Sequence, residues 1–180
     1  MFGPSYDFVN LTFEFVLLPL AIVAMFAGSI TAIFQTNAKR LFAYSSVAQL
    51  GYMMLGVALS NIPGLMATIL HIFNHALMKG ALFMALGCVI YRLGNVSLAS
   101  MKGLSRSMPW TMGALILGGL SLIGVPGTVG FISKWHLLLG TLEAGFWPIA
   151  ILIVASSLLA VIYIWRIVEV AYLENEINQE

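Results

Sequence analysis

Three ionisable side chains lie close together in the middle of a long apolar stretch. His71, His75 and Lys79 follow one another at intervals of four residues within the segment LHIFNHALMKG, residues 70–80. On an α-helix this spacing turns each side chain about 40° from the last, so the three form one polar stripe over about two turns. An ionisable group inside a membrane costs roughly 2.5–3.5 kcal/mol on insertion scales, so a chain that keeps three is expected to use them.

A fourth candidate, Lys134, follows an interruption in another apolar run. The segment GVPGTVG, residues 124–130, holds a proline, which removes a backbone donor, and three glycines, which have little helical preference. We therefore expect the helix to break at Pro126 and Gly127. Irregular backbone inside a membrane is tolerated only where protein or water meets it, so a broken helix followed by a buried lysine is typical of an ion path.

Histidine and buried lysine side chains are suited to proton transfer. Histidine titrates near neutral pH, and desolvation disfavours the charged form of an amine, so a lysine inside a membrane can act as a switchable charge. We predict a proton pathway that contains Lys79, Lys134, His71 and His75. Supporting hydrogen bonds are expected from the polar side chains near these groups, namely Asn74, Ser45, Ser46, Gln49 and Ser133.

Other uses of these side chains fit the sequence less well. His71 and His75 could hold a metal ion on one helix face, but no third ligand follows at a suitable spacing. Axial haem ligation would need a histidine at similar depth on a second helix, and His136 lies too near the end of its span. No phosphate-binding glycine loop and no arrangement of nucleophile and base is present, so catalysis in this chain is not expected. One alternative stays open, in which the polar stripe only holds helices together as a structural scaffold.

The composition identifies the class of protein to which these residues belong. Of the 180 residues, 61% are hydrophobic and 8% are charged. Soluble domains carry roughly 25% charged residues, so this is an integral membrane protein. The net charge of +1 provides no basic face for nucleic acid. The single cysteine, Cys88, cannot form an internal disulfide and is expected to be a buried thiol within its apolar run.

Five apolar runs are long enough to cross a bilayer, which takes about 20 residues each. We predict an all-α, polytopic membrane protein that forms a single membrane domain over residues 1–180, with one discontinuous helix in the fourth span. The five predicted spans lie at about 15–34, 41–59, 62–91, 110–140 and 146–172.

Basic residues mark two of the connections between these spans. Lys39 and Arg40 lie between the first and second spans, and Arg92, Lys102 and Arg106 lie between the third and fourth. Lys and Arg accumulate in short cytoplasmic loops, so both connections are predicted to be cytoplasmic. The N-terminus is then outside, the acidic C-terminal tail is inside, and the protein is placed in the inner (cytoplasmic) membrane.

Three ordered segments carry a resemblance to a known family. They are KRLFAYSS at residues 39–46, HIFNHALMK at 71–79 and GVPGTVGFISKW at 124–135. Together they resemble the antiporter-like proton-channel subunits shared by respiratory complex I, membrane-bound hydrogenases and Mrp-type cation/proton antiporters. The resemblance covers about residues 13–172. It looks closest to the D subunit of Mrp antiporters, with the complex I subunits as the nearby alternative.

This resemblance implies an architecture and a role for each candidate residue. Members of the family are much longer and hold two five-helix repeats of opposite orientation, and this chain looks like the C-terminal repeat alone. By the resemblance, Lys79 matches the central channel lysine, Lys134 matches the lysine on the second broken helix, and the two histidines form the connecting relay. The buried glutamate and lysine pair of the family's first repeat has no counterpart in this chain.

The resemblance also implies a function and a set of partners. The expected function is the proton-translocating half-channel of a multisubunit Na⁺/H⁺ antiporter, with a proton-pumping subunit of complex I or a membrane-bound hydrogenase as the alternative. The implied partners are other membrane subunits, the lipid bilayer, protons and, for the antiporter, Na⁺. No cofactor is expected in this chain, because the electron chemistry of a redox complex would belong to its partner subunits.

Overall fold

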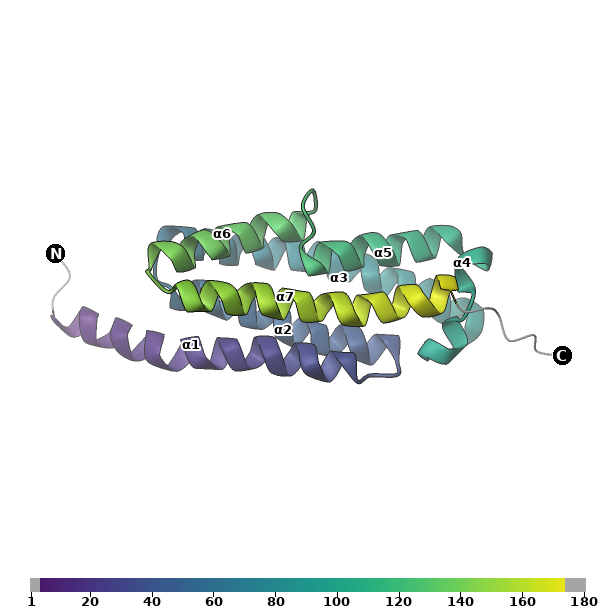
Figure 1. The fold of residues 1–180 in the computed structure, drawn as a ribbon, viewed down its shortest axis with the longest axis horizontal. Helices are drawn as coiled ribbons and strands as arrows, with labels where there is room; N and C mark the ends of the chain where they lie inside the picture. The colour runs from purple at the N-terminus through teal and green to yellow at the C-terminus, as the bar shows by residue number, and fades with distance from the viewer. Residues whose placement is uncertain (1–3, 174–180) are drawn as a thin grey trace.

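The computed structural model describes the backbone of residues 4–173 and the side chains of residues 15–173 as a bundle of helices that run along one axis (Figure 1). No β-strand occurs in this part of the chain, so the all-α fold is confirmed. The acidic tail that was predicted to be cytoplasmic lies outside the described residues. In chain order the elements are α1 (Pro4–Ile33), α2 (Ala38–Ala58), α3 (Ile62–Leu93), η1 (Leu98–Met101), α4 (Leu104–Ser107), α5 (Pro109–Ile123), α6 (Val129–Glu143), α7 (Trp147–Val168) and the π-helical turn η2 (Glu169–Leu173).

Four of these helices, α1, α2, α3 and α7, are each long and apolar enough to cross a membrane. The remaining span, the fourth in chain order, is divided between α5 and α6, which lie end to end along the bundle (Figure 1). Each of the two has 15 residues. At 1.5 Å per residue they cover about 45 Å together, which is enough for a bilayer. The expected arrangement of five spans with one discontinuous helix is therefore present.

Asparagine side chains begin both α2 and α3. Asn37 accepts hydrogen bonds from the backbone N–H groups of Lys39 and Arg40, and Asn61 accepts one from Gly64. These are N-cap contacts, which satisfy donors that have no partner within the helix. Asn61 also donates to the carbonyl of Gly140 at 2.7 Å, which fixes the start of α3 against the end of α6.

The break between α5 and α6 is made by glycine and proline. Gly124 and Gly127 have φ angles of 90° and 91°, in the left-handed region that glycine adopts without steric cost. Pro126 lies between them and cannot continue the backbone hydrogen bonds of a helix. Figure 1 shows this loop near the middle of the bundle's length, projecting away from the other helices. The break therefore lies at about half the depth of the membrane-spanning part.

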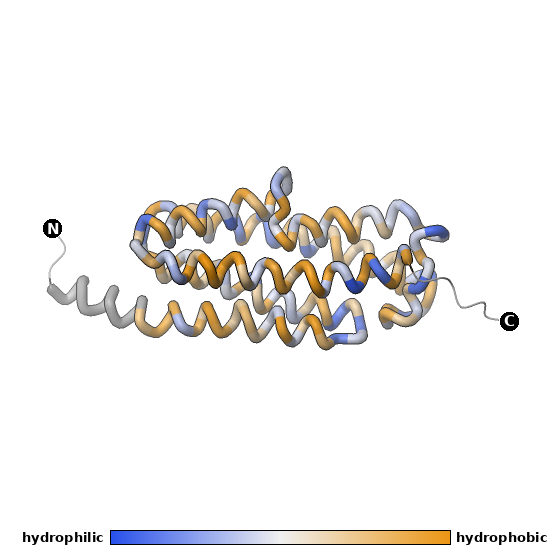
Figure 2. Tube along the Cα trace, in the orientation of Figure 1, coloured by the Kyte–Doolittle hydropathy of each residue, from blue (hydrophilic) through white to orange (hydrophobic). Residues whose placement is uncertain are grey.

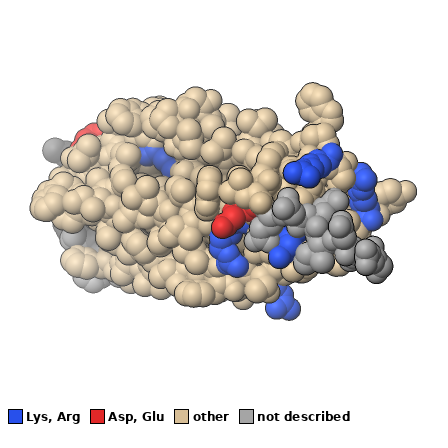
Figure 3. Space-filling model, turned by 45° about the vertical axis from the view of Figure 1, so that its right-hand side comes forward, with Lys and Arg blue, Asp and Glu red and all other residues tan. Residues whose placement is uncertain are grey.

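The surface is apolar along the helices and basic at one end. Figure 2 shows hydrophobic residues along the length of the bundle and hydrophilic residues mostly near its ends. Lys and Arg gather at the end that carries the loops after α1 and α3 (Figure 3). A β-bridge between Asn37 and Ser97 brings these two loops together. The two basic connections identified in the sequence therefore form one basic end of the molecule.

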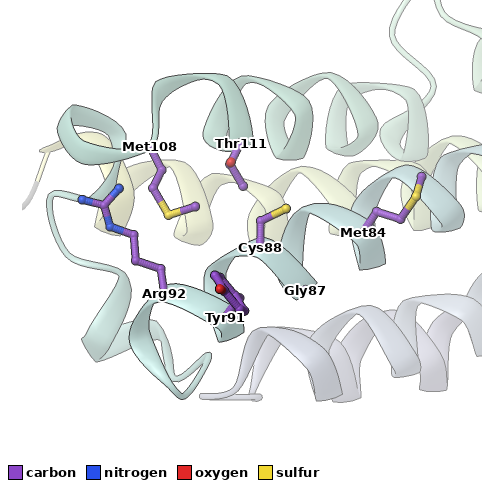
Figure 4. A pocket seen from close by; sticks show the side chains of 7 residues that line it. All are labelled: Met84, Gly87, Cys88, Tyr91, Arg92, Met108 and Thr111. Carbon is purple, nitrogen blue, oxygen red and sulfur yellow. The ribbon is translucent and has the colours of Figure 1, made fainter.

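An open groove of about 690 Å³ lies between α3 and α5 on the outside of the bundle (Figure 4). Cys88 is exposed in this groove, so the expectation of a buried thiol was wrong. The apolar run around Cys88 faces outward because a membrane helix presents apolar side chains to lipid as well as to its neighbours. No residue of the predicted proton pathway lines the groove, which is formed by Met84, Gly87, Cys88, Tyr91, Arg92, Met108 and Thr111.

Candidate functional site

Lys79 lies at the middle of α3 and is only 7% exposed. Its Nζ atom donates to the backbone carbonyl of Phe42 and to the hydroxyl of Ser45, each at 2.5 Å, and both acceptors are on α2. The ammonium also lies 5.4 Å from the ring centroid of Phe42 and 5.9 Å from that of Phe83, within the range of a cation–π interaction. Each of these partners of Lys79 is uncharged.

The Phe42 carbonyl is shared by three donors. Besides Lys79, the hydroxyls of Ser45 and Ser46 donate to it at 2.9 and 3.2 Å. Serine side chains in helices commonly bond to the carbonyl three or four residues earlier. The structure thus brings Ser45 into contact with Lys79, and Ser46 donates to the same Phe42 carbonyl.

His71 joins α3 to two other helices. Its Nδ1 lies 2.7 Å from the Ser133 hydroxyl on α6, and its Nε2 lies 2.8 Å from Oε1 of Gln49 on α2. A neutral ring can donate from Nε2 to Gln49 and accept from Ser133 at Nδ1. A protonated ring can donate to both, because Ser133 can then turn its proton to the carbonyl of Gly130, 3.2 Å away. The site accommodates His71 in either charge state.

His75 lies one turn further along α3, between His71 and Lys79. The rings of His71 and His75 are stacked, with centroids 6.2 Å apart and an interplanar angle of 18°. The Nδ1 atom of His75 is buried and has no hydrogen-bond partner among the described residues. The predicted connecting relay is therefore not a continuous chain of direct hydrogen bonds at this point.

Lys134 lies on α6, just after the helix break, and is 5% exposed. Its Nζ donates to the carbonyls of Leu122 and Ile123 at 3.0 and 2.9 Å, and to the Ser157 hydroxyl on α7 at 3.0 Å. The two carbonyls belong to the last turn of α5, where the backbone acceptors lack helical partners and the helix dipole favours a cation. The break in the helix thus creates the acceptors that hold Lys134.

Two further contacts fix α6 in position. The Asn74 side chain on α3 donates to the carbonyl of Val129 at 2.8 Å, which attaches the first residue of α6 to α3. The N–H of Gly130 donates to the Ser121 hydroxyl on α5 at 3.3 Å. The backbones approach so closely here that a Cβ atom on Gly130 would overlap the carbonyl oxygen of Ser121. Asn74 therefore acts on the position of the broken helix.

Three polar residues outside the predicted pathway and supporting sets, Tyr52, Ser157 and Tyr163, also lie inside the bundle. The Tyr52 ring lies 4.6 Å from Nζ of Lys134, and its hydroxyl is 3.3 Å from Ser157 Oγ. Tyr163 on α7 is completely buried. Tyr52 could have been found from its position three residues after Gln49, on the same helix face. The signal for Ser157 was the polar pair that it forms with Ser156 in an aliphatic segment.

The arrangement can hold two ammonium groups inside one helical bundle, each with a serine hydroxyl among its acceptors. Among the described residues, no group of three or more His, Cys, Asp or Glu side chains could bind a metal ion. The fold and the site therefore define a polytopic α-helical membrane protein with ionisable groups inside its bundle.

Comparison with known proteins identifies the family. The family model described as "NADH:quinone oxidoreductase/Mrp antiporter, TM" matches residues 1–160, and the chain belongs to this family. NADH-quinone oxidoreductase subunit N of Desulforudis audaxviator is 46% identical over 156 residues, which are 87% of this chain and 31% of that protein. F(420)H(2) dehydrogenase subunit N of Methanosarcina mazei is 33% identical over 168 residues, 88% of this chain and 34% of that protein. The chain spans about a third of the length of these curated relatives.

Solved structures from two kinds of complex share the fold. A chain of the Mrp complex from Dietzia sp. DQ12-45-1b matches with a TM-score of 0.84 and 31% identity, over 88% of this chain and 30% of that one. A chain of respiratory complex I from Thermus thermophilus with bound NADH matches with a TM-score of 0.86 and 25% identity, over 92% and 35%. The predicted family is confirmed. The curated relatives named above are N subunits of redox complexes, which does not favour the closer resemblance to the Mrp D subunit.

Proposed function

We propose that this chain forms part of the proton path in an antiporter-like membrane subunit of a redox-driven complex of the NADH-quinone oxidoreductase type. The observation that carries the proposal is the presence of two lysines, Lys79 and Lys134, inside one bundle with uncharged partners. The predicted pathway residues His71 and His75 lie on α3 with Lys79. His71 contacts two of the predicted supporting residues, Gln49 on α2 and Ser133 on α6, the helix that holds Lys134.

The partners of the two lysines support a switchable charge. Buried charges in proteins are usually paired with an opposite charge, which fixes their protonation state. Within residues 15–173, the acceptors of Lys79 and Lys134 are backbone carbonyls and serine hydroxyls. A neutral amine still has two N–H groups to donate to such acceptors. Each lysine can therefore keep hydrogen bonds in both states, as a group that takes up and releases a proton requires.

The exposed helix break supports a role inside a larger assembly. Pro126 and Gly127 are exposed near mid-length of the bundle. Irregular backbone at membrane depth is not tolerated against lipid and requires protein or a water-filled cavity. We infer that the rest of a longer subunit covers this loop and supplies the other half of the proton path. Other membrane subunits and the lipid bilayer are the proposed partners, and no cofactor is assigned to this chain.

The redox complex is preferred over the antiporter because of the relatives, while the site itself is compatible with both. The similarity to the Mrp complex keeps Na⁺/H⁺ exchange as the second candidate. The proposed topology places the basic end of the bundle in the cytoplasm, because short basic loops are retained there. The N-terminus then lies outside and the C-terminus inside the inner membrane.

The test is proton translocation by vesicles that contain the complete complex with Lys79→Ala. We expect loss of proton translocation with normal assembly, because Ser45 and Ser46 still donate to the Phe42 carbonyl after the ammonium is removed. Lys39→Ala, at the exposed basic end, is the matched control and should translocate normally. A structural scaffold predicts the opposite result, in which Lys79→Ala reduces assembly and the surviving complexes keep their full activity.

A further inference from the structure

Tyr52 on α2 meets the Lys134 site through both its ring and its hydroxyl. The ring centroid lies 4.6 Å from Nζ of Lys134, within the range of a cation–π interaction. The Tyr52 hydroxyl is 3.3 Å from Oγ of Ser157 on α7, and Ser157 accepts a hydrogen bond from Lys134 at 3.0 Å. Tyr52 is only 3% exposed, so these contacts lie inside the bundle.

The position of the Tyr52 ring is fixed by two other helices. The His71 ring on α3 lies edge-to-face with it, with centroids 5.9 Å apart and an interplanar angle of 66°. His71 is itself held at both ring nitrogens. The hydroxyl of Tyr52 reaches Ser157 on α7. The ring is therefore in place before a proton arrives, as a preorganised site requires.

The Tyr52 ring differs from the other partners of Lys134 because it distinguishes the two charge states of the lysine. The carbonyls of Leu122 and Ile123 and the hydroxyl of Ser157 accept N–H groups, which a neutral amine also carries. The face of an aromatic ring attracts a cation through its quadrupole, most strongly when the cation is desolvated, and a neutral amine has no such charge. The ring therefore stabilises the ammonium selectively.

The hydroxyl of Tyr52 acts on the same lysine through Ser157. When Lys134 donates to Ser157 Oγ, the serine proton needs an acceptor of its own, and Tyr52 Oη is within reach. A serine that donates to Tyr52 presents its lone pairs to the lysine. Phenylalanine would supply the same ring face without this contact, so the hydroxyl accounts for a tyrosine at this position.

We propose that Tyr52 is a positioning residue for proton uptake at Lys134, in which its ring stabilises the ammonium and its hydroxyl orients Ser157 toward Nζ. This inference rests on the proposed function and deepens it. One N–H bond forms at Nζ when the amine takes up a proton, and Tyr52 itself neither gains nor loses one. Tyr52 thus acts on how readily Lys134 is charged.

The experiment changes the charge on the ring face while nearly keeping its shape. Phenylalanine, and phenylalanines with one, two or three ring fluorines, are incorporated at position 52, and proton flux is measured per assembled complex in vesicles. Each fluorine weakens cation binding by the ring, so the flux should fall stepwise from Tyr52→Phe onward, by about tenfold over the series. The same series at Phe26, which packs against the same apolar cluster, is the matched control and should leave the flux unchanged.

A second comparison tests the hydroxyl. Tyr52→Phe should lower the flux by about threefold in the wild-type background, as expected for the loss of one hydrogen bond. The same substitution should have no effect when Ser157→Ala is already present, because the hydroxyl acts through Ser157. An equal loss in both backgrounds would overturn the role of the hydroxyl.

Equal flux across the fluorinated series at position 52 would overturn the role of the ring, since a residue that only packs is indifferent to the charge on its face. If Lys79→Ala still abolishes the flux in that case, the proposed function stands. Normal flux in Lys79→Ala would overturn both.

Discussion

The Nζ atom of Lys79 on α3 donates to the hydroxyl of Ser45 on α2 at 2.5 Å, although the two residues are 34 positions apart in the chain. Ser45 also donates to the Phe42 carbonyl at 2.9 Å. Ser45 is thus the hydroxyl group that directly contacts the Lys79 ammonium.

Ser45→Ala should therefore lower proton flux without loss of assembly, because the Phe42 carbonyl remains as an acceptor for Lys79. Ser46→Ala is a closely matched control, since Ser46 donates to the same carbonyl but has no hydrogen bond with the lysine. The measurement is proton uptake by vesicles, normalised to assembled complex. Equal flux in the two variants would count against a role for Ser45 beyond helix structure.

At Lys134, we expect Glu to be tolerated better than Ala. A glutamate can still take up and release a proton, whereas Lys134→Ala removes the titratable group and leaves the carbonyls of Leu122 and Ile123 without their donor. Proton flux should be partly retained in Lys134→Glu and lost in Lys134→Ala. The same flux in both variants would argue against a relay at this position.

Gln49→Leu should destabilise the bundle, because it leaves Nε2 of the buried His71 without its hydrogen-bond partner. The expected loss is about 1–3 kcal/mol in the free energy of unfolding. Gln35→Leu is the control, since the Gln35 side chain donates to the carbonyl of Thr31 within its own segment near the end of α1. Thermal denaturation of the purified complex should show a lower midpoint for Gln49→Leu than for Gln35→Leu, and no difference would contradict the structural role of the His71 contact.

Gly130→Ala should disturb the crossing of α5 and α6, because the new Cβ would overlap the Ser121 carbonyl oxygen. Overpacking of this kind costs about 1–3 kcal/mol. Gly113→Ala is a suitable control, since a Cβ at Gly113 on α5 meets no atom within 4 Å. Assembly yield and thermal stability should fall for Gly130→Ala and stay unchanged or rise for Gly113→Ala. A tolerated Gly130→Ala would show that the two half-helices can separate without consequence.

The amino-acid sequence alone determined the class of fold, the interruption of one helix and the presence of ionisable groups within apolar runs. These features are local. The length of an apolar run sets whether it can cross a bilayer, and Pro126 with its flanking glycines interrupts a helix wherever that helix lies. The two lysines were visible for the same reason, because a charged residue in the middle of an apolar run is costly.

Only the tertiary structure decided what each of these groups contacts. The acceptors of Lys79 and Lys134 include the backbone carbonyls of Phe42, Leu122 and Ile123, and a carbonyl has no signature in a sequence. The contact of Lys134 with Ser157 depends on how α6 packs against α7, which no local pattern specifies. A sequence shows which groups are expensive to bury; the packing of the helices decides which partners make that burial possible.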